Sequence, residues 1–227
     1  MMNEQTVKES DAFGQQSARL LRTAFILSVI TVVYNIGEGI VSTAFGYSDD
    51  TLALFGFGVD SFVEVMSGIG VGHMVWRMMR SPVEGHDRFE RRALYITGIS
   101  FFILAAGLVA ASILNIVNRV KPDTTIAGIV ISAVSIATMW ALYSYKLKTG
   151  KKLDSAPIIA DANCTKTCFY LSFILLGSSI LYELFRINYI DIIGSLGIAW
   201  FAFREGRESI EKARSNSLTC SCHDCGE

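Results

Sequence analysis

Six long apolar segments dominate this sequence and leave few ways for the chain to fold. They cover approximately residues 20–45, 52–76, 93–117, 125–145, 158–185 and 190–203. The hydrocarbon core of a bilayer is about 30 Å thick, and about 20 apolar residues in an α-helix cross it. In water, amphipathic helices would have to cover these segments, and a chain of 227 residues has none left for that purpose. We therefore predict an all-α, polytopic membrane protein with six transmembrane helices.

The basic residues are distributed unevenly among the connections between these segments. Most of the 20 Lys and Arg residues precede the first segment, separate the second from the third or the fourth from the fifth, or follow the sixth. Cytosolic loops carry such an excess, so we expect both termini in the cytosol. The chain then divides into a polar cytosolic leader (residues 1–19), a six-helix transmembrane domain (20–213) and a cysteine-rich cytosolic tail (214–227). The leader does not resemble a cleaved secretory signal.

Acidic residues and cysteines interrupt the second and fifth segments on one side of each predicted helix. In the second segment, Asp60 and Glu64 lie one helical turn apart. In the fifth segment, a single helical face carries Asp161, Cys164, Thr165 and Cys168. A charged side chain at the bilayer centre costs about 3 kcal/mol and usually marks a site or a pathway. These two faces are therefore the candidates for function.

The two faces are expected at the same depth in the membrane. Counted from opposite ends of antiparallel helices, Asp60 and Cys164 lie about 12 Å into the bilayer, and Glu64 and Cys168 about 18 Å. Two carboxylates and two thiols form a four-ligand set that suits a divalent, fairly soft metal ion. We therefore predict a metal site formed by these four side chains.

Other interpretations of the polar residues stay open at this point. A third polar face in the first segment carries Asn35, Glu38 and Ser42. Glu38 is a candidate for the ion pathway, and Asp161 fits a helix cap or a vestibule as well as a ligand. Asp60 and Glu64 could instead pair with Lys166 or share protons, while the cysteines pack as small apolar residues. Lys166 itself fits a side chain that reaches the cytosolic surface.

Three stretches resemble the helix signatures of the cation diffusion facilitator family. They are ALFGFGVDSFVE in the second segment, ADANCTKTC in the fifth and YIDIIGSLGIAWFAFREGRESIE in the sixth. The resemblance implies a six-helix metal/proton antiporter whose transport site combines an acidic pair on the second helix with a His/Asp pair on the fifth. Asp60 and Glu64 take the positions of the acidic pair. Cys164 stands where the family has the histidine, and Cys168 where it has the aspartate.

The sequence departs from the family pattern outside these helices as well. SPVEGHDRFERRAL replaces the histidine-rich connection between the second and third helices, which argues against a second site at Glu84, His86 and Asp87. The family's large cytosolic domain, its usual dimer clamp, does not follow the sixth helix. We still expect a homodimer, with Gly194 and Ala199 as small contact points on the sixth helix.

The chain ends in a short stretch with several metal-ligand side chains, TCSCHDCGE. Its thiolate and imidazole groups are Cys220, Cys222, His223 and Cys225. In a reducing cytosol these residues favour a metal site or free thiols over disulfides. A tail without a role is the alternative.

These features predict a transporter in the plasma or inner membrane rather than an enzyme. The expected cargo is a divalent heavy-metal ion, Zn²⁺ or Cd²⁺ first, exported from the cytosol in exchange for protons. Thiols and carboxylates release protons when they bind metal, which couples the two fluxes. We expect metal ions, protons, lipid and a second copy as partners, with no prosthetic group and no nucleic acid. The alternatives are a membrane metal sensor or buffer, and a thiol oxidoreductase, for which cysteines one helical turn apart are poorly placed.

Overall fold

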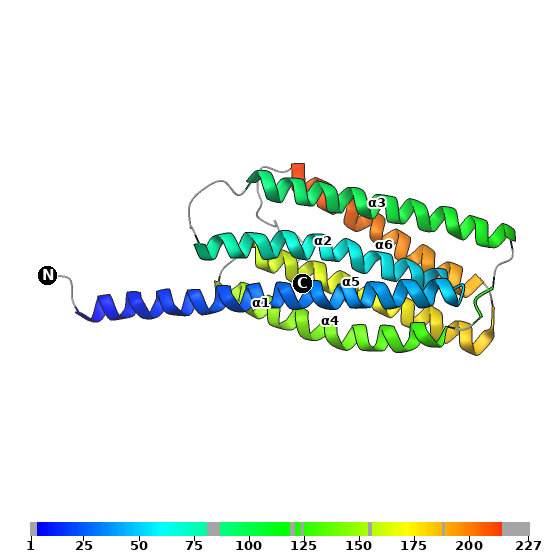
Figure 1. The fold of residues 1–227 in the computed structure, drawn as a ribbon, viewed down its shortest axis with the longest axis horizontal. Helices are drawn as coiled ribbons and strands as arrows, with labels where there is room; N and C mark the ends of the chain where they lie inside the picture. The colour runs from blue at the N-terminus through cyan, green and yellow to red at the C-terminus, as the bar shows by residue number, and fades with distance from the viewer. Residues whose placement is uncertain are drawn as a thin grey trace, which may run out of the picture.

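The protein is a bundle of six long α-helices (Figure 1). A computed structural model describes residues 4–80, 87–118, 121–123, 125–153, 156–187 and 189–214. The helices are α1 (Glu4–Ser48), α2 (Leu52–Arg80), α3 (Asp87–Asn118), α4 (Ile126–Leu153), α5 (Ala156–Phe185) and α6 (Tyr189–Arg214). Each contains one of the six apolar segments to within one residue, and the all-α prediction is confirmed.

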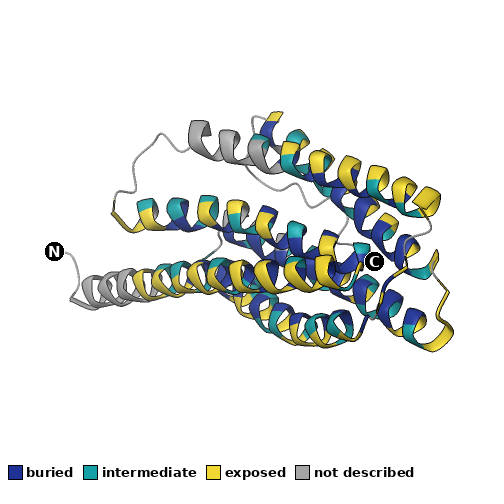
Figure 2. Ribbon diagram, turned by 45° about the vertical axis from the view of Figure 1, so that its right-hand side comes forward, coloured by how far each residue is buried: buried dark blue, intermediate teal, exposed yellow. Residues whose placement is uncertain are grey.

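Five of the described helices are long and apolar enough to cross a membrane. These spans are Ala18–Ser48, Leu52–Arg77, Gly98–Asn118, Ile126–Leu153 and Asp161–Phe185. In α6 the apolar stretch is shorter, because Arg204 and Glu205 begin a charged second half. Buried residues face the inside of the bundle and exposed residues face outward (Figure 2). Among the exposed side chains are large apolar ones such as Ile103 and Trp200, as expected for surfaces that face lipid. The chain is a multi-pass membrane protein.

The helices run up and down in chain order, so α1 begins and α6 ends at the same end of the bundle (Figure 1). The most extensive pairings are α1 with α2, α3 with α6, and α4 with α5. We call the opposite end, where α2, α4 and α6 begin, the distal end. The largest cluster of buried apolar residues joins α2, α3, α5 and α6 through side chains such as Phe57, Leu108, Leu175 and Ile198.

The small residues of α6 serve this internal core. A Cβ atom at Gly194 would lie 2.6 Å from the side chain of Ser178 on α5 and 3.3 Å from Ala53 on α2. Ala199 is 3% exposed and belongs to the same core cluster. The expectation that Gly194 and Ala199 are contact points between two copies is therefore wrong, because both positions are filled from within one chain.

A glycine brings α1 and α2 into close contact. A Cβ atom at Gly58 would lie 2.6 Å from the backbone nitrogen of Thr43 on α1, too close for any side chain to be accommodated. Gly56 faces the side chain of Leu108 on α3 instead, and Gly68 faces Val32 on α1. The close approach at Gly58 holds the polar face of α1 against the acidic face of α2.

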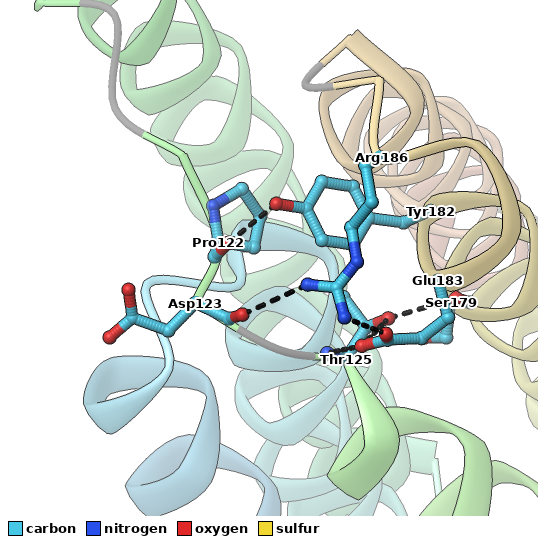
Figure 3. Close-up of polar contacts among 7 residues, drawn as sticks. All are labelled: Pro122, Asp123, Thr125, Ser179, Tyr182, Glu183 and Arg186. Carbon is cyan, nitrogen blue, oxygen red and sulfur yellow. Dashed lines mark hydrogen bonds and ion pairs between the residues drawn. The ribbon is translucent and has the colours of Figure 1, made fainter.

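A polar cluster at the distal end ties the connection before α4 to the end of α5 (Figure 3). The backbone N–H of Thr125 donates to Glu183 Oε1 at 2.6 Å, and its hydroxyl donates to the carbonyl of Ser179 at 2.8 Å. Arg186 pairs with Glu183 at 2.6 Å and donates to the carbonyl of Asp123 at 3.2 Å. The Tyr182 hydroxyl donates to the carbonyl of Pro122. These bonds fix the segment just before α4 against the last turns of α5.

A second distal contact joins α6 to the start of α2. The carboxylate of Asp191, 3% exposed, accepts hydrogen bonds from the backbone N–H groups of Leu52 at 2.9 Å and Ala53 at 3.3 Å. The first N–H groups of a helix have no partner within the helix, and a carboxylate also interacts favourably with the helix dipole. Asp191 therefore sets where α2, the helix with the acidic pair, begins relative to α6.

Replacing Asp191 with Ala should lower the free energy of unfolding by about 2 kcal/mol or more, since two largely buried donors lose their acceptor. Thermal unfolding of the purified protein in detergent measures the effect. Asp191→Asn, which keeps one acceptor, should fall between the alanine variant and the wild type. The control is Asp123→Ala, because the Asp123 side chain points away from the polar cluster (Figure 3). Equal stability of the Asp191 and Asp123 variants would contradict the capping role.

Candidate metal-binding site

The acidic pair of α2 lies inside the bundle. Asp60 is 2% exposed, and its Oδ1 atom has no hydrogen-bond partner among the described residues. Glu64 is half-buried and accepts a hydrogen bond from the side-chain amide of Asn35 on α1 at 3.0 Å. The two carboxylates act on each other electrostatically. A buried carboxylate oxygen without a donor is costly, which marks Asp60 as a place where a cation would be stabilised.

Glu38, the pathway candidate on the polar face of α1, lies beside this pair. It is 8% exposed and accepts hydrogen bonds from the Tyr34 hydroxyl at 2.9 Å and from the Ser61 hydroxyl at 3.1 Å. Its charge acts on both Asp60 and Glu64. The packing of α1 on α2 thus gathers three carboxylates, and the two oxygens of Glu38 are already held by donors.

The α5 side of the predicted site is only partly described. Cys168 is 4% exposed and packs in an apolar cluster with Met139 and Leu142 of α4 and with Leu27 and Tyr34 of α1. The side chain of Cys164 lies outside the described part. Among the described side chains, no group of three or more His, Cys, Asp or Glu residues is close enough to hold a metal ion. The four-residue metal site therefore stays a prediction.

Asp161 is engaged by a lysine. Its Oδ2 atom lies 2.8 Å from Lys146 Nζ on α4, with the two side chains 6% and 1% exposed. Lys146 also donates to the Thr165 hydroxyl at 3.0 Å. Because Lys146 directly follows the fourth segment, it counts among the basic residues expected on the cytosolic side. Its side chain is instead buried between α4 and α5, which corrects that expectation. Lys166, the other lysine considered, has its ammonium 5.8 Å from the centroid of the Tyr170 ring.

Glu205 is a further acidic residue near the proposed site, and the sequence alone did not single it out. Glu205 on α6 accepts a hydrogen bond from Thr167 on α5 at 3.1 Å, and its charge acts on Asp60. In the sequence it begins the charged second half of α6, where it looks like a solvated residue. The available signal was its position, because Glu205 lies within one helical turn of Phe203, the last residue of the sixth apolar segment.

Some predicted ligands cannot be placed. Glu84 and His86, the side chain of Asp87, and the tail residues Cys220, Cys222, His223 and Cys225 lie outside the described residues. Both the second-site question and the tail site therefore stay predictions.

A family profile described as the cation efflux transmembrane domain matches residues 28–216. The chain belongs to this family. The match includes all the intramembrane site residues, from Glu38 on α1 to Cys168 on α5. The sequence is also 25% identical over 176 residues to an uncharacterized transporter of Methanocaldococcus jannaschii. That alignment covers 75% of this chain and 62% of the relative, so the chain spans less than two thirds of the relative's length.

Within this cation efflux domain, the bond from Asn35 to Glu64 makes α1 a support for the acidic helix. Asn35 is fully buried, and its amide Oδ1 has no partner among the described residues, so the amide is held by its one bond to Glu64. A neutral amide orients the carboxylate without offsetting its charge, whereas a basic partner would offset it.

Replacing Asn35 with Ala should weaken binding of a divalent cation about tenfold, because a hydrogen bond to a charged group is worth about 1.5–3 kcal/mol. Equilibrium binding of Zn²⁺ or Cd²⁺ to the purified protein measures the change. Ser42→Ala is the matched control, since Ser42 is equally buried on α1 and its hydroxyl has no partner in the described part of the chain. Equal affinities of the two variants would argue against a positioning role for Asn35.

Proposed function

We propose that this protein exports a divalent heavy-metal ion such as Zn²⁺ or Cd²⁺ from the cytosol in exchange for protons. The observation that carries the proposal is the Asp60 carboxylate, buried at 2% exposure on a membrane-spanning helix with one oxygen unpartnered among the described residues. It lies next to Glu64 in a domain of the cation efflux family. A bilayer makes such an arrangement costly unless a cation offsets the charge.

The ligands on α5 would determine which cation this is. Cys168 lies on the same helical face as Cys164, and the charges of Lys146 and Asp161, from α4 and α5, act on Glu64. Thiolates select soft ions and carboxylates harder ones, so a set of two each suits Zn²⁺ and Cd²⁺ better than Mn²⁺. The proton exchange follows from the same chemistry, because each ligand is protonated when the metal leaves.

The packing of the helices supports a transport cycle in which two helix pairs move relative to each other. α1 packs extensively on α2 and α4 on α5, whereas the contact between α2 and α5 is much smaller. A site with ligands from both α2 and α5 would therefore lie at the weaker of these contacts. Small shifts there can open the site to one side or the other while both pairs stay intact.

The orientation, the oligomeric state and the tail complete the proposal. The excess of Lys and Arg at the end where α1 begins and α6 ends favours the cytosol on that side. A homodimer would need contacts other than Gly194 and Ala199, which are buried within the chain. The tail would collect ions for the site without forming a route across the bilayer.

The double change Asp60→Asn with Glu64→Gln should reduce metal uptake into proteoliposomes to the level of empty vesicles, since the cargo loses both hard ligands. Glu211→Gln removes a carboxylate that is 61% exposed on α6 and should leave uptake unchanged. Wild-type uptake by the double variant would place the site elsewhere. A wild-type protein that binds metal without uptake would instead be a membrane sensor or buffer.

The pair of changes Cys164→His and Cys168→Asp should make the site harder and favour Zn²⁺ over Cd²⁺. We expect the ratio of Cd²⁺ to Zn²⁺ uptake to fall about tenfold, equivalent to about 1.4 kcal/mol. Uptake of Zn²⁺, Cd²⁺ and Mn²⁺ is compared for this variant and the wild type. Changing the tail residues Cys220, Cys222 and Cys225 to Ala controls for soft ligands outside the membrane. An unchanged metal order with intact uptake would mean that the α5 cysteines do not bind the ion.

A further inference from the structure

A buried ion pair joins α4 to α5 next to the proposed site. The Lys146 ammonium, on a side chain that is 1% exposed, lies 2.8 Å from Asp161 Oδ2 and donates to the Thr165 hydroxyl at 3.0 Å. The Thr165 hydroxyl in turn donates to the backbone carbonyl of Asp161 at 3.2 Å. The lysine is thus held at two points on one turn of α5.

This pair borders the proposed ligands on two sides. Asp161 precedes Cys164 by three residues and Cys168 by seven, so all three share one face of α5. The charges of both Lys146 and Asp161 act on the Glu64 carboxylate of α2. Asp161 is therefore a carboxylate close to the proposed site that already has a cation of its own.

Stability does not explain why such a pair is present. Moving two charges out of water costs several kcal/mol for each ion, and their mutual attraction often only offsets that cost. Well-packed apolar residues in place of a buried ion pair often hold two helices together as well or better. The distal contacts of Thr125, Tyr182, Glu183 and Arg186 already join the same two helices.

We propose that Lys146 sets the metal preference of the site by holding Asp161 out of the ligand set. This inference rests on the proposed function of the same site. A free Asp161 would add a third carboxylate beside Asp60 and Glu64 and shift the site toward hard ions such as Mn²⁺. With Asp161 bound to Lys146, α5 offers thiolates, and the neutral pair adds no net charge to the site. Lys146 is a positioning residue that acts through Asp161.

The test measures equilibrium binding of Cd²⁺ and of Mn²⁺, each alone, to the full chain purified in detergent. Lys146→Gln frees Asp161, so this variant should prefer Cd²⁺ over Mn²⁺ about tenfold less than the wild type does, equivalent to about 1.4 kcal/mol. Adding Asp161→Asn to Lys146→Gln removes the freed carboxylate and should restore the preference to within about twofold of the wild type. Lys146→Arg keeps the ion pair and should also retain the wild-type preference.

The Mn²⁺ concentration that displaces bound Cd²⁺ is a readout that a purely structural role would not move, and the ultraviolet absorption of Cd²⁺ bound to thiolates follows the displacement. The absorption should be present in all these variants, and more Mn²⁺ should be needed to displace Cd²⁺ from the wild type than from Lys146→Gln. An unchanged preference in folded Lys146→Gln would overturn the inference. So would the same shift in the variant that also carries Asp161→Asn, because the effect would then not pass through Asp161.

A further variant keeps the test decisive if Lys146→Gln does not fold. Asp161→Asn leaves an unpaired ammonium beside Glu64, so it should weaken Cd²⁺ and Mn²⁺ binding alike, by about tenfold, and the double variant should restore both. If Asp161→Asn and the double variant bind Cd²⁺ and Mn²⁺ with the affinities of the wild type, the inference is overturned. Metal uptake by the wild type into proteoliposomes separates the two proposals: binding without uptake contradicts the transport function, whereas uptake with an unchanged preference contradicts only the role of Lys146.

Discussion

The hydrocarbon core of a membrane requires every polar group inside it to find a partner within the protein, and this constraint organises the whole bundle. Backbone groups meet it by forming helices. The acidic side chains meet it one by one: Glu38 through two hydroxyl donors, Glu64 through an amide, and Asp161 through an ammonium. Asp60 differs, because one of its oxygens has no partner within the described residues. Of these four acidic residues, the one that satisfies the constraint least well is the one on which the proposed function depends.

Much of this arrangement could be predicted from the sequence, because both bilayer thickness and helical periodicity act on residues close together in the chain. The apolar segments located the helices, and the spacing of Asp60 and Glu64 placed them on one face. The polar face of α1 was also predicted, and its contact with α2 is now seen in the bond from Asn35 to Glu64. Predicting where the helices lie along the chain and which of their faces are polar needs no knowledge of how the helices pack.

What the sequence left undecided concerns contacts between distant helices. Lys146 precedes three other basic residues, so its pattern is that of a cytosolic flank, and only the position of Asp161 on α5 explains its burial. Gly194 looks suited to a contact between copies until Ser178 and Ala53 are seen to fill the space beside it. A small residue marks a close approach, but the sequence alone does not say which helix approaches.

The same constraint links the metal preference to the mechanics of the bundle. α4 and α5 are joined at two levels, by the ion pair of Lys146 with Asp161 and by the distal cluster around Thr125 and Glu183. α1 and α2 are joined by the close approach at Gly58 and by the bond from Asn35 to Glu64. Each of the two helix pairs therefore carries its own satisfied polar contacts, and relative motion of the pairs breaks none of these bonds. In the proposed cycle, the metal ion would be a polar contact between α2 and α5, and its binding and release would change the interaction between the pairs without exposing the charges inside either one.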